Sequence, residues 1–508
     1  MLSLLTCASS GASCPIAPPP LPKFHISVNL GDGPRDVNAI FAYRGVWHAM
    51  HQANWTDWAH LVSTDLVRWT RLPSALSPNG DWDGTLTILD GKPIILYDCY
   101  NVADCRPPSV GAAAPSDPAI IGVARPVDLN DPNLTHWSKD PLNPIAILNG
   151  STGEGPSNMW RGTDGRVNFV AAQRGGSPAV RYQSSDPSLH NWTVARPYPF
   201  YEAIGGGVAM FYPLPNSSRR MAASGEPTHL FGHVVPPSGH GTGTPWFALG
   251  TYNEDTGFKQ VGSSVPIERS EMMVFGILGA VGGSATAASD RLLYLGWFNA
   301  NPYSPQDTTN PSNTLSLPRE VTYDGNQLVA NPVSELASLR EAALGSVGAI
   351  TLAPQASLQV LDSPSTTFDL EMEVALPDGL PLSFGVSIMA GSSLLDTEVI
   401  LKIHVAPPGQ VARLVNVSAE VPFAAYHREL YNTSFAFELP TSETTMGVRI
   451  LADRSVVETF IAGGRGVVTS PVLSPGAHPN RTGLAIFANQ TSLRLIAANA
   501  WEMGCGWA

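Results

Sequence analysis

The sequence predicts an all-β protein in which an N-terminal β-propeller is followed by a smaller β-sandwich. Short runs rich in Val, Ile, Phe, Tyr and Trp recur between Gly, Pro, Asn and Asp turns, whereas long helical periodicity is scarce. The Trp-rich turns give way near residue 350 to a plainer alternation of apolar and polar residues. Evenly spaced short strands favour radial repetition, and the later alternation is typical of an antiparallel sandwich.

Several propeller strands can be located from turn and strand signals. Asp90-Gly91 forms a tight turn, and the apolar run that follows it is read as a buried strand. Similar strand signals occupy residues 39–52, 58–64, 86–98, 165–173 and 291–299.

The pattern changes between the two predicted domains. Leu336, Leu339 and Leu344 recur on one side of a short helical pattern, which indicates a connector. Residues 1–22 contain a short apolar run without basic residues, which makes a weak signal peptide. We therefore expect an N-terminal segment (1–22), a propeller (23–334), a helical linker (335–349) and a sandwich (350–508).

Charge and composition exclude several classes of partner. The chain has 29 basic and 42 acidic residues, a net charge of -13, and only 14% charged residues. Such a surface repels phosphate backbones, so we expect no nucleic acid or acidic-lipid partner. The uncharged stretch 272–289 contains four glycines and is read as two buried strands, so we expect no membrane span. Neutral sugars remain possible ligands.

Cysteines and sequons favour export, and neither points to a metal or a cofactor. The odd, sparse cysteines form no metal-ligand pair, although Cys99 and Cys105 are spaced to close a short disulfide in an oxidising compartment. His229 and His233 are four residues apart, but Pro227 and Gly232 argue against the helix of a zinc site. No dinucleotide fingerprint follows a strand. Asn-x-Ser/Thr sequons support a secreted or vacuolar location; they begin at Asn54, Asn133, Asn149, Asn191, Asn216, Asn416, Asn432, Asn480 and Asn489.

Seven phrases, in order along the chain, resemble glycoside hydrolase family 32, which contains invertases and fructan-cleaving enzymes. They occupy residues 35–52, 58–76, 91–97, 294–297, 315–320, 326–336 and 452–470. The resemblance implies a five-bladed propeller with a β-sandwich appended. It also implies a funnel at the propeller axis that recognises a fructose unit. The implied reaction is hydrolysis or transfer of β-fructofuranosyl units of sucrose or fructans with retention of configuration.

The first catalytic box of that family supplies the nucleophile, and Asp36 occupies its place. The family box reads Asn-Asp-Pro-Asn-Gly, whereas Arg35, Val37 and Ala39 stand at three of its positions here. Arg35 would lower the pKa of Asp36 if the two side chains meet. Asp36 either lines the central pocket or caps a turn.

At the positions that align with the second and third catalytic boxes, the expected carboxylates are absent. Aligning on Trp160 puts Gly155 where the family has the Asp that holds fructose hydroxyls, and Glu154 where it has Arg. Aligning on residues 211–213 leaves residues 207–210 opposite the acid/base Glu, without a carboxylate. Glu202, five residues upstream, is the nearest candidate for the acid/base. Glu154 is either a substitute hydroxyl acceptor or a solvated loop residue.

Five further positions match or adjoin the implied sugar site. Gln52, Trp58 and His60 match sugar-contacting positions after the first hairpin. Trp82 and Asp83 stand where the family has an aromatic residue followed by Ser. A Trp face stacks on sugar rings, but burial in the propeller core is the alternative for each Trp. Asp83 adds a carboxylate that the family lacks.

Three functions are compatible with these residues. The chain is an active β-fructosidase or fructosyltransferase, a catalytically impaired carbohydrate-binding relative, or a glycosidase with relocated carboxylates. The relocated set would combine Asp36 with Asp83, Glu154 or Glu202. Retaining glycosidases need two carboxyl groups about 5 Å apart, so the missing boxes bear directly on activity.

Overall fold

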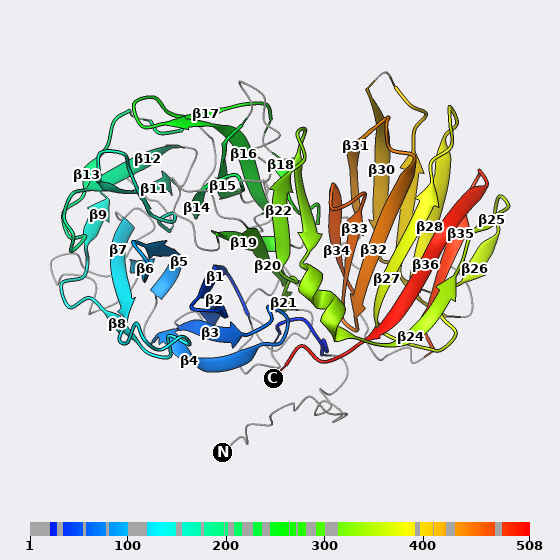
Figure 1. Cartoon of the computed structure of the whole chain (residues 1–508), viewed down its shortest axis with the longest axis horizontal. Coiled ribbons are helices and arrows are strands. Elements are labelled where there is room, and N and C mark those ends of the chain that lie inside the picture. The colour runs from blue at the N-terminus through cyan, green and yellow to red at the C-terminus, as the bar shows by residue number, and fades with distance from the viewer. Residues whose placement is uncertain are drawn as a thin grey trace, which may run out of the picture.

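The computed structural model of the chain describes most of its strands and many of the connections between them. The described residues are 21–27, 34–53, 57–77, 81–99, 119–148, 155–173, 177–197, 199–201, 208–215, 227–235, 244–263, 265–270, 273–280, 291–299, 313–391, 397–409, 411–422, 432–472 and 480–507. The predicted all-β class is confirmed, with a propeller beside a sandwich (Figure 1).

Five antiparallel sheets form the blades of the propeller, as the resemblance implied. Blade 1 comprises β1 (Val37–Tyr43), β2 (Val46–Ala53), β3 (Asp57–Ser63) and β4 (Thr70–Leu76). Blade 2 comprises β5 (Asp81–Leu89), β6 (Lys92–Cys99), β7 (Ala119–Pro126), β8 (Trp137–Lys139) and β9 (Ala146–Leu148). Blade 3 comprises β10 (Trp160–Arg161), β11 (Val167–Gln173), β12 (Ser177–Ser184) and β13 (Thr193–Val194). Blade 4 comprises β14 (Ala209–Pro213), β15 (His229–Val235), β16 (Thr244–Asn253), β17 (Gly257–Gln260) and β18 (Val265–Pro266). Blade 5 comprises β19 (Met273–Ala280), β20 (Leu292–Asn299), β21 (Asn313–Leu315), β22 (Arg319–Tyr323) and β23 (Leu328–Pro332).

The first strand of each blade lies at the inner edge of its sheet. Neighbouring first strands contact each other, β1 with β5 and β19, β5 with β10, and β14 with β19. They therefore surround the propeller axis. Residues that precede or begin these five strands meet at one end of the axis, although they are far apart in the sequence.

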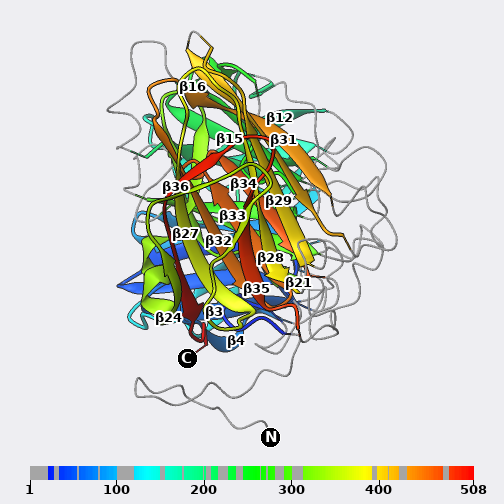
Figure 2. The same ribbon diagram turned by 90° about the vertical axis from the view of Figure 1, so that its right-hand side faces the viewer.

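The sandwich consists of two antiparallel sheets, whose strands run alongside each other in Figure 2. One sheet contains β24 (Arg340–Val347), β25 (Ile350–Leu352), β27 (Thr367–Ala375), β32 (Thr445–Asp453), β33 (Val456–Ile461), β34 (Gly466–Pro471) and β36 (Leu493–Met503). The other contains β26 (Ser357–Gln359), β28 (Leu382–Ala390), β29 (Thr397–Val405), β30 (Ala412–Glu420), β31 (Thr433–Pro440) and β35 (Gly483–Ala488).

The predicted helical linker differs from the structure. A 3-10 helix occupies only Ser334–Leu339, and β24 begins at Arg340 and pairs with β36. Leu336 and Leu339 are buried as the pattern indicated. Leu344, by contrast, belongs to the sandwich core. Hydrogen bonds to β36 are available to this segment only in the folded chain, and that tertiary pairing overrides its local helical preference.

One cluster of buried apolar side chains crosses from the propeller to the sandwich. It extends from blades 1, 4 and 5 to Leu451, Phe460 and Val467 of the sandwich. The C-terminal segment also crosses the boundary, because Trp507 bridges to Trp69 of blade 1. The two domains are therefore packed as one unit.

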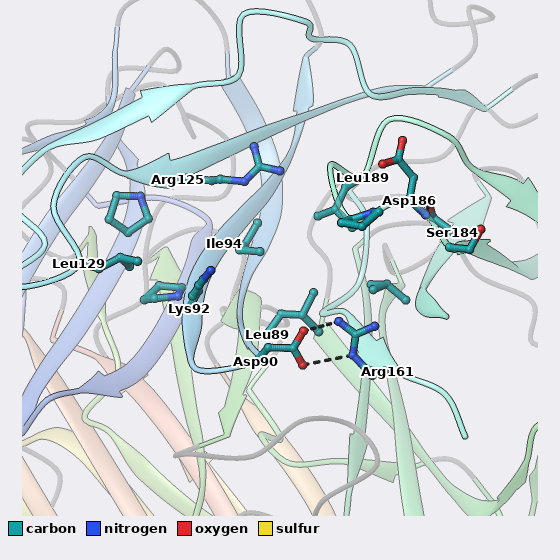
Figure 3. A pocket seen from close by; sticks show the side chains of 15 residues that line it. Leu89, Asp90, Lys92, Ile94, Arg125, Leu129, Arg161, Ser184, Asp186 and Leu189 are labelled. Carbon is teal, nitrogen blue, oxygen red and sulfur yellow. Dashed lines mark hydrogen bonds and ion pairs between the residues drawn. The ribbon is translucent and has the colours of Figure 1, made fainter. Parts of the chain in front are cut away.

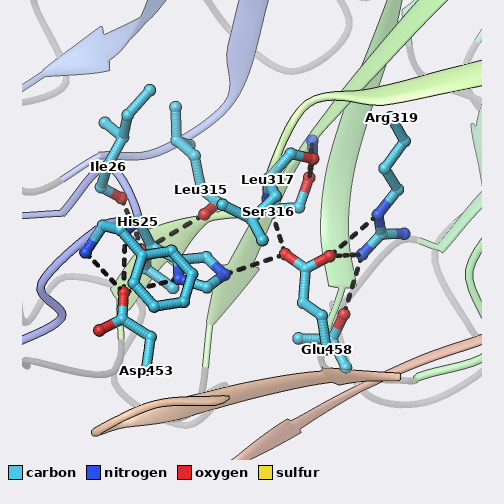
Figure 4. A network of polar contacts seen from close by, with 12 residues as sticks. His25, Ile26, Leu315, Ser316, Leu317, Arg319, Asp453 and Glu458 are labelled. Atoms are coloured by element: carbon cyan, nitrogen blue, oxygen red, sulfur yellow. Dashed lines mark hydrogen bonds and ion pairs between the residues drawn. The ribbon is translucent and has the colours of Figure 1, made fainter. Parts of the chain in front are cut away.

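A buried polar network lies at the same boundary (Figure 4). Arg319 of β22 donates to Glu458 of β33 at 2.8 Å and to Glu268 at 2.9 Å. Asp453 of β32 accepts hydrogen bonds from the backbone N–H groups of Phe24 and His25. The network thus ties the N-terminal segment, blade 4 and blade 5 to one sheet of the sandwich.

His25 connects the two halves of this network. Its Nδ1 lies 2.8 Å from Asp453 Oδ2, and its Nε2 lies 3.2 Å from Glu458 Oε1. Burial alone lowers the pKa of His25, but the two carboxylates outweigh that effect and raise it to about 9. The imidazolium therefore bridges two buried carboxylates at neutral pH.

Candidate active site

Asp36 lies immediately before β1, at the end of the innermost strand of blade 1. The Gln52 N–H donates to the Asp36 carbonyl at 2.8 Å, and the Arg35 N–H donates to the Gln52 carbonyl at 3.2 Å. Backbone pairing with β2 thus continues up to Asp36 and fixes its position. A bulge between Val37 and Ala39 follows at once. Bulges commonly turn a side chain into a site at the rim of a sheet.

Asp83 lies at the corresponding place on blade 2. It follows the start of β5, where the register with β6 shifts between Asp81 and Gly84. A side chain at Gly84 would run into the Leu96 carbonyl and approach the Trp58 ring to 3.0 Å, so only glycine fits there. The Asp83 side chain is 8% exposed. Its Oδ1 accepts a hydrogen bond of 2.7 Å from Gln52 Nε2.

Blades 3 and 4 complete the surroundings of Asp83. Gly155 has φ of 62°, a conformation that favours glycine. A Cβ at Gly155 would lie 3.2 Å from Asp83 Cβ and 2.6 Å from Val208 Cγ2. Asp36, Asp83, Gly155 and Val208 come from four successive blades. The structure therefore brings together what remains of the three catalytic boxes.

The electrostatics couple the two carboxyl groups. Removal from water raises the pKa of the half-buried Asp36, and the negative charge of Asp83 raises it further. Arg35 has the opposite effect, but the net pKa of Asp36 is well above its usual value. Burial also lowers the pKa of Arg35 to about 10, against the opposing effect of Asp36. Arg35 thus lowers the pKa of Asp36 as the sequence suggested, but burial and Asp83 outweigh it, and the net shift is upward.

Trp58 and His60 lie in the core between blades 1 and 2, and both are fully buried. The Trp58 indole N–H donates to the Trp82 carbonyl at 2.8 Å, and so holds the start of β5 beside Asp83. His60 Nε2 lies 2.9 Å from His48 Nδ1. Gln52 is also buried, but it contacts a carboxylate at the axis, and Trp82 is partly exposed.

Glu154 and Glu202 lie outside the described residues, so their sequence-based roles stay predictions. One polar residue near Asp36, Asn38, was not predicted from the sequence as a site residue. Asn38 is the extra residue of the β1 bulge; its side chain is fully buried and makes no hydrogen bond within the described part of the chain. Asn38 could have been predicted from the sequence, because it aligns with the second Asn of the family's first box.

No group of three or more His, Cys, Asp or Glu side chains could hold a metal ion among the residues that the structure describes. His229 begins strand β15 and does not lie on a helix, in agreement with the argument from Pro227 and Gly232. Within the described ranges no helix is long and apolar enough to cross a bilayer. Residues 273–280 of the uncharged stretch form β19.

A separate cleft of about 440 Å³ lies between blades 2 and 3 (Figure 3). Asp90 forms an ion pair with Arg161 across it, and Arg125 pairs with Asp140 at 2.7 Å. Asp90 follows β5 at the end opposite Asp83, roughly 20 Å away for a strand of this length. This cleft is therefore distinct from the carboxylate site at the axis.

The sequence matches two family models that together span nearly the whole chain. Residues 34–332 match the glycosyl hydrolases family 32 N-terminal domain, and residues 335–502 match the family 32 C-terminal domain. The chain belongs to glycoside hydrolase family 32. It is 26% identical to the β-fructofuranosidase insoluble isoenzyme CWINV1 of Arabidopsis thaliana, covering 92% of this chain and 88% of the relative. It is also 26% identical to a fructan 6-exohydrolase of Beta vulgaris, covering 92% and 84%.

Solved structures show the same fold at lower identity. Fructan 1-exohydrolase IIa from Cichorium intybus superposes with a TM-score of 0.77 at 21% identity, covering 97% of this chain and 99% of that chain. Exo-inulinase from Aspergillus awamori gives a TM-score of 0.72 at 17% identity, covering 96% and 98%. These similarities confirm the arrangement of propeller and sandwich.

Proposed function

We propose that this chain cleaves terminal β-fructofuranosyl units from sucrose or fructans, by hydrolysis or transfer, with Asp36 as the nucleophile. The observation that carries the proposal is the position of Asp36 at the propeller axis, within electrostatic reach of a second carboxylate, Asp83. A retaining glycosidase requires a nucleophilic carboxylate and an acid/base carboxyl group at one sugar, and Asp36 stands at the place of the nucleophile. Relatives named β-fructofuranosidase and fructan exohydrolase support the choice of sugar.

The reaction proceeds in two displacements. A carboxylate oxygen of Asp36 attacks the anomeric carbon of the fructosyl unit, and the bond to the leaving oxygen breaks as that oxygen takes a proton. Water, or a sugar hydroxyl in transfer, then attacks the anomeric carbon of the fructosyl ester. The bond to the Asp36 oxygen breaks, which frees the carboxylate, and the attacking oxygen loses its proton to the acid/base group that protonated the leaving oxygen in the first step. Glu202 is the candidate for this group on sequence position. Each displacement passes through a cationic oxocarbenium-like state, which nearby carboxylates stabilise.

The other residues predicted from the sequence have different roles in the site. Asp83 faces the substrate, Gln52 holds Asp83 in place, and partly exposed Trp82 supplies an aromatic surface at the rim. Trp58 and His60 shape the site from the core and do not contact the sugar. Glu154 remains a candidate hydroxyl acceptor on sequence position.

We also propose that the protein is exported through the secretory pathway. Cys99 and Cys505 are both disulfide-bonded, and disulfides persist in oxidising compartments. Cys105, the partner that the sequence suggested for Cys99, lies outside the described residues. The Arabidopsis and Oryza relatives named insoluble isoenzymes agree with an extracellular location. Digestion of the protein from its native source with an N-glycosidase should lower its apparent mass; an unchanged mass would count against export.

Fructose and glucose release from sucrose, inulin and levan tests the catalytic proposal. Asp36→Asn should lower the rate of release by at least about 100-fold, because an amide is a poor nucleophile. Asp378→Asn, an exposed residue of the sandwich, is the matched control and should release sugar at the wild-type rate. If the wild-type protein releases nothing but binds these sugars in calorimetry, the chain is a carbohydrate-binding relative and the catalytic proposal is wrong.

A further inference from the structure

We propose that Asp83 supplies from blade 2 the hydroxyl-binding and charge-stabilising carboxylate that family 32 carries in its second box. This inference rests on the proposed function. The second box of this chain has Gly155 where that Asp is expected. The carboxylate has therefore moved from one blade to its neighbour, and the chain retains the group at the axis.

The two positions occupy almost the same space. A Cβ at Gly155 would lie 3.2 Å from Asp83 Cβ, a separation tighter than ordinary van der Waals contact. The same Cβ would lie only 2.6 Å from Val208 Cγ2, so residue 155 cannot carry a side chain in this packing. The left-handed φ of 62° at Gly155 agrees with that restriction. The loss of a side chain at residue 155 and the gain of a carboxylate at residue 83 are thus complementary.

Gln52 fixes the new carboxylate relative to the nucleophile. Its backbone N–H binds the Asp36 carbonyl at 2.8 Å, while its side-chain amide binds Asp83 Oδ1 at 2.7 Å. One residue of blade 1 therefore spans from the nucleophile to the carboxylate of blade 2. Gln52 is 2% exposed, so its side chain has little freedom to leave this arrangement. We assign Gln52 as a positioning residue that acts through Asp83.

The Asp83 carboxylate can accept more than one hydrogen bond. The Gln52 amide donates to its Oδ1 at 2.7 Å. An ionised carboxylate has about four lone-pair sites, enough to accept this amide and also sugar hydroxyls. Its negative charge also lies near the reacting carbon, where the transition state becomes positive. Each of these properties belongs to the missing second-box Asp.

The decisive experiment compares Asp83→Asn with wild type on two substrates. One is sucrose, whose leaving group needs protonation, and the other is an aryl β-fructofuranoside, whose leaving group does not. A hydroxyl-binding carboxylate contributes to both, so kcat/KM should fall on both by roughly 100-fold or more. Asp378→Asn should change neither, and thermal unfolding should verify that Asp83→Asn is folded.

Gln52→Leu tests the positioning role. It should reduce kcat/KM less than Asp83→Asn does, and the double variant should be no worse than Asp83→Asn alone, because Gln52 acts through the carboxylate. An additive loss would contradict that role.

Three results distinguish the outcomes. If Asp83→Asn keeps activity within about threefold on both substrates, Asp83 has no such role and the inference is overturned. If only sucrose cleavage falls, Asp83 is the general acid and the hydroxyl-binding assignment is overturned. If the wild-type protein cleaves neither substrate, the proposed function fails first, and the inference with it.

Discussion

Arg319 of blade 5 donates from Nη2 to Oε2 of Glu458 in the sandwich at 2.8 Å, with both side chains fully buried. The same guanidinium binds Glu268 of blade 4 through Nη1 at 2.9 Å. One cation thus neutralises two carboxylates that the domain boundary removes from water. The interface therefore depends on Arg319 more than on either carboxylate alone.

Replacing Arg319 with Ala should destabilise the whole protein. The change leaves Glu268 buried without its cation and leaves Glu458 with only the His25 imidazolium, and breaking a buried ion pair costs about 3–5 kcal/mol. The urea midpoint of unfolding measures the effect. Lys402→Ala is the control, because Lys402 forms an exposed pair with Glu420 and should cost less than about 1 kcal/mol. Equal losses in the two variants would show that the buried network does not stabilise the boundary.

His25 predicts a stability that falls at alkaline pH. Its pKa is raised from 6.5 to about 9 by Asp453 and Glu458, so folding favours the protonated ring. The stabilisation is complete below pH 6.5 and is lost as pH rises through about 9. Its size is on the order of 3 kcal/mol for a shift of this magnitude. Unfolding free energies between pH 6 and 10 should show this loss in the wild type.

The variant His25→Gln provides the control for that titration. It keeps a hydrogen-bonding side chain at the boundary but cannot titrate, so its stability should be lower at pH 6 and flatter up to pH 10. A wild-type curve that is parallel to the His25→Gln curve over this range would show that His25 does not contribute the titrating proton.

The sequence was most informative in segments whose residues together form one part of the structure, such as the domain boundary. The phrases around Arg319 and Glu458 resemble family signatures, and the two residues meet in the boundary network. Their regularity therefore reflects the docking of the sandwich on the propeller. Strands were also predictable, because their turn and burial patterns are local.

The site was harder to predict because its parts come from different blades. Asp83 and Gly155 are 72 positions apart in the sequence, and only the closed propeller shows that they compete for one space. Trp58 matched a sugar-contacting position, yet its ring is buried and its N–H serves the backbone at Trp82. Pattern matching locates a residue near the axis but does not give the direction of its side chain, which the bulges at β1 and β5 determine.

Gly155→Ala should reduce both stability and activity. The new Cβ would adopt an unfavourable left-handed φ and would press against Val208 and Asp83, at a cost of about 1–3 kcal/mol. Displacement of Asp83 should also lower kcat/KM. Gly165→Ala is the matched control, since Gly165 has φ of 81° with open space around it. It should be destabilised by strain but keep wild-type kcat/KM. Full activity in Gly155→Ala would mean that the packing around Asp83 does not matter to catalysis.

The pH dependence of kcat/KM should reveal the coupling between Asp36 and its neighbours. The nucleophile must be ionised, so activity rises as pH increases through the Asp36 pKa. Burial and Asp83 raise that pKa, which places the acid limb above the value of about 3.9 for an ordinary Asp. Asp83→Asn removes a negative charge and should move the acid limb of its residual activity to lower pH. Arg35→Met removes a positive charge and should move it to higher pH. Because the two shifts have opposite signs, a general loss of folding cannot imitate them, and shifts in the same direction would show that the limb belongs to another group.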